Sequence, residues 1–127
     1  GAYHPVIVCK TNGYEGALEY KADRMPVGQY PKNDEFAEIK FTLEEGDCVY
    51  MFSDGYVDQF NRQGDRKFLK KNLVSVFQDI CKQPMPQQYS EIVKRMDDWK
   101  GSAPQIDDML VVGFKFSKSQ NFKTESN

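Results

Sequence analysis

The acidic residues that could do chemistry in this sequence stand at two points, each beside an apolar run. Asp54 follows the run from Cys48 to Phe52. Asp107 and Asp108 precede the run from Met109 to Phe116. Carboxylates brought together without cysteine or histidine suit Mg²⁺ or Mn²⁺, because these hard cations prefer oxygen ligands. A simpler alternative stays open, in which Asp54 caps a turn and the acidic pair belongs to a solvated loop.

The two apolar runs are predicted to be strands that bring these carboxylates to one place. Cys48–Phe52 is an uninterrupted apolar run between turn signals, a pattern typical of a strand buried on both faces. Gly55, directly after Asp54, allows the chain to turn at once. If this strand and Met109–Phe116 are antiparallel neighbours, the end of one lies beside the start of the other. Asp54 would then converge with Asp107 or Asp108.

Three further strands are predicted from β-rich composition or from alternation of apolar and polar residues: Val6–Cys9, Ala17–Lys21 and Ala37–Leu43. The turn signal Thr11-Asn12-Gly13 indicates that the first two form a hairpin. We expect Ala37–Leu43 to pair antiparallel with Cys48–Phe52, because the turn between them is short.

Two helices are predicted from apolar residues at three- and four-residue steps. The first spans about Leu69 to Cys81, and the second runs from about Pro86 to Trp99 and ends at Gly101. Strands followed by helices and a final strand indicate an α+β fold with an antiparallel sheet. The helices would cover one face of this sheet.

The other face of the sheet would need a partner, since a strand that is apolar on both sides requires cover on both sides. Val6, Val8 and the Cys48–Phe52 run would supply that face. We therefore expect the chain to be an excised piece of a longer domain. We also expect self-association through the uncovered face.

Chain length, net charge and cysteine content indicate what kind of protein this is. The chain has 127 residues and a net charge of −2, which suits one domain without the basic field that nucleic-acid binding requires. The three cysteines, Cys9, Cys48 and Cys81, stand among apolar neighbours and are expected to be buried reduced thiols. This favours a cytoplasmic location, and whether the parent protein is anchored in a membrane stays open.

Several short motifs, taken in order, resemble the C-terminal half of SpoIIE-like serine/threonine phosphatases of the metal-dependent type 2C superfamily. The motifs are Gly1-Ala2-Tyr3-His4-Pro5, Met25-Pro26-Val27-Gly28, Gly46-Asp47, Ser53-Asp54-Gly55, Asp58-Gln59, Gly64, Arg66-Lys67-Phe68 and Asp107-Asp108-Met109. The resemblance covers Ala2 to about Phe116. It implies that residues 1–117 belong to the phosphatase domain, and we expect residues 118–127 to be a disordered polar tail.

The resemblance implies a four-layer αββα sandwich, in which two antiparallel sheets pack together with helices outside each. It implies that Asp54 and Asp107 bind metal, that Gly55 keeps the turn tight, and that Asp108 supports the site. The implied reaction is hydrolysis of phosphoserine or phosphothreonine by a water that bridges two Mn²⁺ or Mg²⁺ ions. The resemblance implies no catalytic group other than that water, so no side chain of this chain is expected to react directly.

The resemblance also implies a bacterial signalling role, as in two-component systems, with an upstream sensor or signalling domain in the same protein. The substrate would be a phosphorylated regulatory protein, such as an anti-sigma-factor antagonist. The family's upstream metal ligands are not in these 127 residues. We therefore expect this chain alone to bind metal weakly and to be inactive or nearly so. Two alternatives stay open, a phosphatase-like module that only binds a partner and a structural α+β domain.

Overall fold

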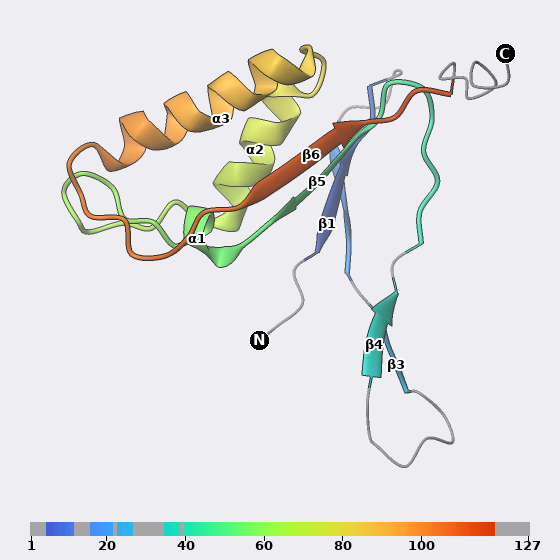
Figure 1. The fold of residues 1–127 in the computed structure, drawn as a ribbon, viewed down its shortest axis with the longest axis horizontal. Coiled ribbons are helices and arrows are strands. Elements are labelled where there is room, and N and C mark those ends of the chain that lie inside the picture. The colour runs from blue at the N-terminus through green and yellow to red at the C-terminus, as the bar shows by residue number, and fades with distance from the viewer. Residues whose placement is uncertain (1–4, 12–15, 22, 27–34, 39, 119–127) are drawn as a thin grey trace, which may run out of the picture.

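The computed structural model describes residues 5–11, 16–21, 23–26, 35–38 and 40–118. Within them, an antiparallel sheet has the strand order β2-β1-β5-β6. Its strands are β1 (Val6–Cys9), β2 (Ala17–Tyr20), β5 (Cys48–Phe52) and β6 (Val111–Lys115). Two long helices, α2 (Lys70–Ile80) and α3 (Met85–Lys100), lie on one side of this sheet (Figure 1). The expected α+β class, the hairpin of β1 with β2 and both helices are confirmed.

Strand β5 occupies the interior of the sheet, between β1 and β6. Four of its five residues are buried, because the strand has neighbours on both edges and apolar cover on much of both faces. On the helix side, the ring of Tyr50 stacks on Phe77 of α2 with centroids 4.0 Å apart. The antiparallel pairing of β5 with β6 places Phe52 opposite Val111. The end of β5 therefore lies beside the start of β6.

The expected pairing of Ala37–Leu43 with β5 is wrong. Both edges of β5 are already occupied by β1 and β6. Strand β4 (Glu35–Glu38) pairs instead with β3 (Asp23–Pro26), a strand that the sequence pattern did not predict. This hairpin projects away from the main sheet (Figure 1). The apolar alternation continues beyond β4 because Phe41 and Leu43 pack on the face of the main sheet rather than in a strand ladder.

The sheet face opposite the helices is apolar and partly covered. Val6, Val8 and Val49 are buried there, and Phe41 and Leu43 pack against them. Further along the same face, register places Met51 opposite Val112 and Val49 opposite Phe114. The exposed fractions of Met51, Val112 and Phe114 are 42%, 42% and 44%. Within the described part of the chain, this end of the face is therefore open to solvent.

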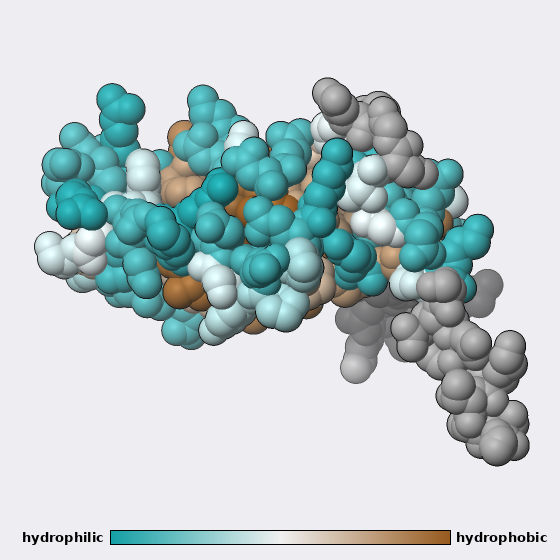
Figure 2. Space-filling view, turned by 90° about the horizontal axis from the view of Figure 1, so that it is seen from above, coloured by the Kyte–Doolittle hydropathy of each residue, from teal (hydrophilic) through white to brown (hydrophobic). Residues whose placement is uncertain are grey.

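The outer face of α3 is polar. Ion pairs at four-residue spacing join Lys94 to Asp98 and Arg95 to Glu91. Seen from this side, the surface is largely hydrophilic, with hydrophobic residues visible only in small areas (Figure 2). None of the helices in the described ranges is both long and apolar enough to span a bilayer.

A buried ion pair fixes the start of β5. The side chain of Asp47 is fully buried and accepts a hydrogen bond from Lys10 Nζ at 2.6 Å. The backbone N–H of Glu44 donates to the same carboxylate oxygen of Asp47 at 2.8 Å. Asp47 therefore has a structural role at the end of β5 that lies away from Asp54. The three cysteines are free and buried, as expected.

Candidate functional site

The ladder between β5 and β6 continues one step beyond the two strands, into the acidic segments. The backbone N–H of Ser53 donates to the carbonyl oxygen of Leu110 at 2.8 Å. Ser53 directly precedes Asp54, and Leu110 follows Asp108 by two residues. The antiparallel pairing on which the expected convergence depended is therefore present, and the two acidic segments lie at one edge of the sheet.

Asp54 is the first residue of α1 (Asp54–Val57), a single helical turn that the sequence pattern did not predict. The turn closes where the backbone N–H of Asp58 donates to the carbonyl oxygen of Asp54 at 2.8 Å. Tyr56 anchors it to α3 by donating its hydroxyl hydrogen to the carbonyl oxygen of Ile92 at 2.7 Å. Burial raises the pKa of Tyr56, so the hydroxyl stays protonated and remains a donor. Asp54 itself is exposed at the start of this anchored turn.

Gly55 is required by its contact with the second acidic segment. A Cβ atom at this position would lie 1.9 Å from the carbonyl oxygen of Asp108 and 2.6 Å from its carbonyl carbon. No side chain fits in that space unless the backbone moves. The glycine thus allows α1 to rest directly on the backbone of Asp108.

The second acidic segment is a loop with its own hydrogen bonds. Asp107 Oδ1 accepts the backbone N–H of Asp108 at 2.8 Å, and Gln105 Nε2 donates to the carbonyl oxygen of Asp107 at 2.9 Å. Both aspartates are exposed. The first bond engages one carboxylate oxygen of Asp107, the second holds its backbone, and the side chain stays exposed to solvent.

Gln59, which belongs to the Asp58-Gln59 motif, is buried beside this site, and the sequence did not predict this burial. Its Nε2 donates to the carbonyl oxygen of Pro104 at 2.9 Å, three residues before Asp107. The backbone carbonyl oxygen of Gln59 accepts the indole N–H of Trp99 at 2.9 Å. Gln59 therefore ties the chain after α1 to the chain before the acidic loop. It stands in a polar stretch without periodicity, so no sequence signal marks it as buried.

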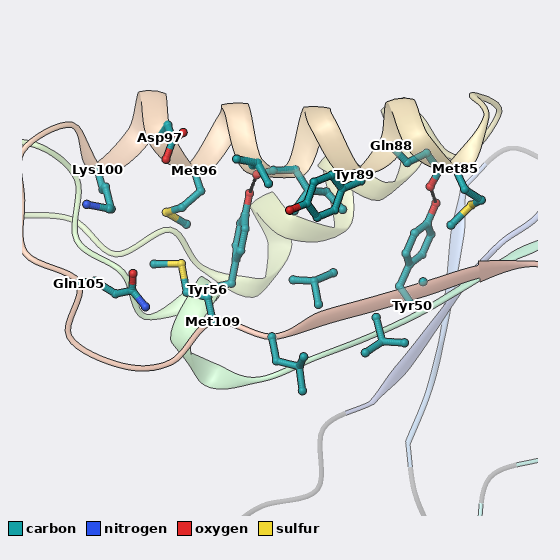
Figure 3. A pocket seen from close by; sticks show the side chains of 16 residues that line it. Tyr50, Tyr56, Met85, Gln88, Tyr89, Met96, Asp97, Lys100, Gln105 and Met109 are labelled. Atoms are coloured by element: carbon teal, nitrogen blue, oxygen red, sulfur yellow. Dashed lines mark hydrogen bonds between the residues drawn. The ribbon is translucent and has the colours of Figure 1, made fainter.

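A groove of about 590 Å³ lies between α3 and the strands β5 and β6 (Figure 3). Tyr50 and Tyr56 point their hydroxyls across it toward α3, where Tyr50 donates to Gln88 Oε1 at 2.6 Å. Met96 and Met109 are among the apolar residues that line it. Asp54, Asp107 and Asp108 are not part of its lining. The three aspartates therefore lie outside the groove, although Gln105 and Met109, on either side of the acidic pair, line it.

The carboxylates of this site are suitable ligands for a hard cation, but they are fewer than such an ion needs. Carboxylate oxygens at an exposed rim suit Mn²⁺ or Mg²⁺. Among the residues that the structure describes, however, no group of three or more His, Cys, Asp or Glu side chains is arranged to hold a metal ion. A metal centre that used Asp54 and Asp107 would therefore need further ligands from outside the described residues.

Comparisons with known proteins agree with this architecture. The family model for stage II sporulation protein E (SpoIIE) matches residues 1–117. Among solved structures, the SiaA-PP2C domain of Pseudomonas aeruginosa has a similar fold, with a TM-score of 0.72 and 24% sequence identity. The match covers 92% of this chain and 44% of that one, so the chain spans less than half the length of that solved chain. A comparison with curated proteins gives no match. The chain belongs to the SpoIIE family and has the fold of part of a PP2C phosphatase domain.

Proposed function

We propose that the protein to which this chain belongs is a Mn²⁺- or Mg²⁺-dependent phosphatase of bacterial signal transduction, acting on phosphoserine or phosphothreonine. Within the SpoIIE family, one structural observation supports this function for the present chain. The turn that begins at Asp54 rests on the backbone of Asp108, so acidic segments more than fifty residues apart in sequence meet at one rim of the sheet. Membership of the SpoIIE family supports the phosphatase class.

The proposed roles follow from where each residue lies. Asp54 and Asp107 hold metal, since both are exposed carboxylates on segments that are fixed by hydrogen bonds. Gly55 allows the two segments to touch, and Asp108 supports the site through its backbone. When bound, a pair of such ions supplies a nucleophilic water at neutral pH and stabilises the charge that develops on the phosphoryl oxygens.

This chain alone is proposed to be inactive or nearly so. Mg²⁺ demands a near-octahedral shell of roughly six ligands and usually retains several waters. Asp54 and Asp107 supply two carboxylates, and the described residues contain no larger acidic group. Two carboxylates at an exposed rim hold such an ion weakly, because water competes for every remaining position.

The proposed partners are a phosphorylated regulatory protein, such as an anti-sigma-factor antagonist, as substrate, and an upstream sensor domain that controls the site. The exposed position of both aspartates supports a protein substrate, because a phosphorylated side chain on a large partner can reach an open rim. A non-catalytic module that binds a phosphoprotein is the competing function, and it predicts binding without hydrolysis.

The test is phosphate release from a phosphoserine peptide by the full-length protein, with and without Mn²⁺. We expect Mn²⁺-dependent release that Asp54→Asn and Asp107→Asn each abolish. Asp65→Asn, a change at another exposed aspartate near α1, is the matched control and should retain activity. Peptide binding without release, unaffected by Mn²⁺, would instead favour the binding module. Mn²⁺-dependent release that survives both changes would show that the proposed site is wrong.

A further inference from the structure

Ser53 stands at the N-cap position of α1 but does not cap it. A serine at this position usually accepts a hydrogen bond from a backbone N–H of the first helical turn. Here the side chain of Ser53 makes no such bond. Its hydroxyl is directed instead to the other acidic segment, across a sequence separation of more than fifty residues.

The Ser53 hydroxyl bridges two backbone groups of that segment. It donates to the carbonyl oxygen of Asp108 at 3.2 Å and accepts the backbone N–H of Leu110 at 2.9 Å. The backbone N–H of Ser53 also donates to the carbonyl oxygen of Leu110. Three hydrogen bonds therefore join one residue of the first segment to the second segment, on either side of Met109.

The same carbonyl oxygen of Asp108 lies against Gly55. Asp108 is thus held by a hydrogen bond from the residue before Asp54 and by close contact with the residue after it. This arrangement fixes the backbone that carries Asp107 relative to the backbone that carries Asp54. A change of Gly55 would disturb the contact by crowding, whereas a change of Ser53 would release it.

We propose that Ser53 is a positioning residue that sets the spacing of the two carboxylates through its hydroxyl bridge to Asp108 and Leu110. The proposal rests on the proposed function, because Asp54 and Asp107 are taken as metal ligands. Ser53 does not act as a nucleophile, since its hydroxyl hydrogen and an oxygen lone pair are already engaged by the second segment. Residues that orient metal ligands typically change metal affinity by about 10–100-fold when removed.

The experiment measures Mn²⁺ affinity of the full-length protein by calorimetry, together with hydrogen exchange of the Leu110 amide in the metal-free protein. We expect Ser53→Ala to lower Mn²⁺ affinity by about tenfold or more and to speed exchange at Leu110. Ser53→Thr keeps the hydroxyl in an extended backbone and should restore most of the affinity. Ser90→Ala is the matched control, because it removes another exposed hydroxyl bonded to a backbone carbonyl, within α3.

The outcomes separate this inference from the proposed function. If Asp54→Asn loses Mn²⁺ binding but Ser53→Ala binds as the unchanged protein does, the positioning role is wrong and the metal site stands. If neither aspartate affects Mn²⁺ binding, the metal site and the positioning role both fall. If Ser53→Ala does not fold, Ser53→Cys replaces it, since a thiol is a weaker donor of similar size. Unchanged Mn²⁺ affinity in Ser53→Cys would then overturn the positioning role.

Discussion

The carbonyl oxygen of Asp108 lies where a Cβ atom of residue 55 would have to be, 1.9 Å from its ideal position. Gly55→Ala should therefore push α1 away from the acidic loop. We expect a loss of about 1–3 kcal/mol in the free energy of unfolding, as for other overpacked sites, measured by urea denaturation. Gly64→Ala is the control, because it introduces backbone strain without crowding. Gly64 has a φ of +78° and nothing within 4 Å of its Cβ position. Equal Mn²⁺ affinity in the Gly55 and Gly64 variants would argue against a role of this contact in the site.

Gln88 is the polar centre of the helix–sheet interface. It is buried, accepts the hydroxyl hydrogen of Tyr50 and donates to the carbonyl oxygens of Cys81 and Gln83. Gln88→Leu should destabilise the fold by about 1–3 kcal/mol, since it leaves the buried Tyr50 hydroxyl without its acceptor and removes one donor from each of the two carbonyl oxygens. Gln87→Leu, at the exposed neighbouring position, is the control and should change stability by less than about 0.5 kcal/mol. Similar denaturation midpoints for the two variants would contradict this interpretation.

Stability should fall steeply at alkaline pH. Burial raises the pKa of the Cys9 thiol above its ordinary value of 9.0 and the pKa of the Tyr50 hydroxyl above its ordinary value of 10.0. The folded state keeps these protons while the unfolded state releases them, so the stabilisation is complete below the ordinary values and declines as pH rises above them. Each such group contributes a slope of about 1.4 kcal/mol per pH unit.

Urea denaturation of the chain and of Cys9→Ala at increasing pH checks this expectation. The variant should be less stable at neutral pH, because a buried side chain is shortened, but its alkaline slope should be shallower. Identical slopes above pH 9 would show that the Cys9 thiol does not contribute to the loss.

The open end of the sheet face opposite the helices should make the chain self-associate. Met51, Val112 and Phe114 are adjacent in register and more than two-fifths exposed. We expect Phe114→Glu to shift sedimentation velocity profiles toward a single smaller species, since a carboxylate disfavours burial of this surface. Tyr89→Glu, a change at an exposed aromatic residue of α3 on the other side of the sheet, is the control and should associate as the unchanged chain does. A chain that remains monomeric at high micromolar concentration would refute the expectation.

The parts of the fold with strong local patterns could be predicted from the sequence. Cys48–Phe52 is apolar throughout because it lies between two strands and packs on both faces, and that cause leaves a continuous signal. Both long helices show the spacing of a single buried stripe, and Gly101 ends the second with a φ of 49°. The edge shared by Asp54 and Asp107 followed from these strands once they were taken as antiparallel neighbours.

The parts that depend on long-range contacts could not be predicted. Helix α1 is a single turn that contains Gly55, and it is held by the bond from Tyr56 to α3 rather than by helix propensity. The alternation of Ala37–Leu43 indicated one strand, yet it is divided between β4 and residues that pack on the main sheet. The bridging role of Ser53 depends on a partner more than fifty residues away, which no local spacing reveals.

The most direct test of a shared metal site is a double-mutant cycle on Mn²⁺ affinity. Calorimetry would compare the full-length protein with Asp54→Asn, Asp107→Asn and the double variant. We expect each single change to reduce affinity by more than the roughly 10–100-fold typical of an outer-shell residue. The double variant should lose little beyond either single one, because the loss of one ligand already disables a common site. Single variants that bind Mn²⁺ as tightly as the unchanged protein, or losses that add as for independent sites, would contradict the assignment of Asp54 and Asp107 to one metal centre.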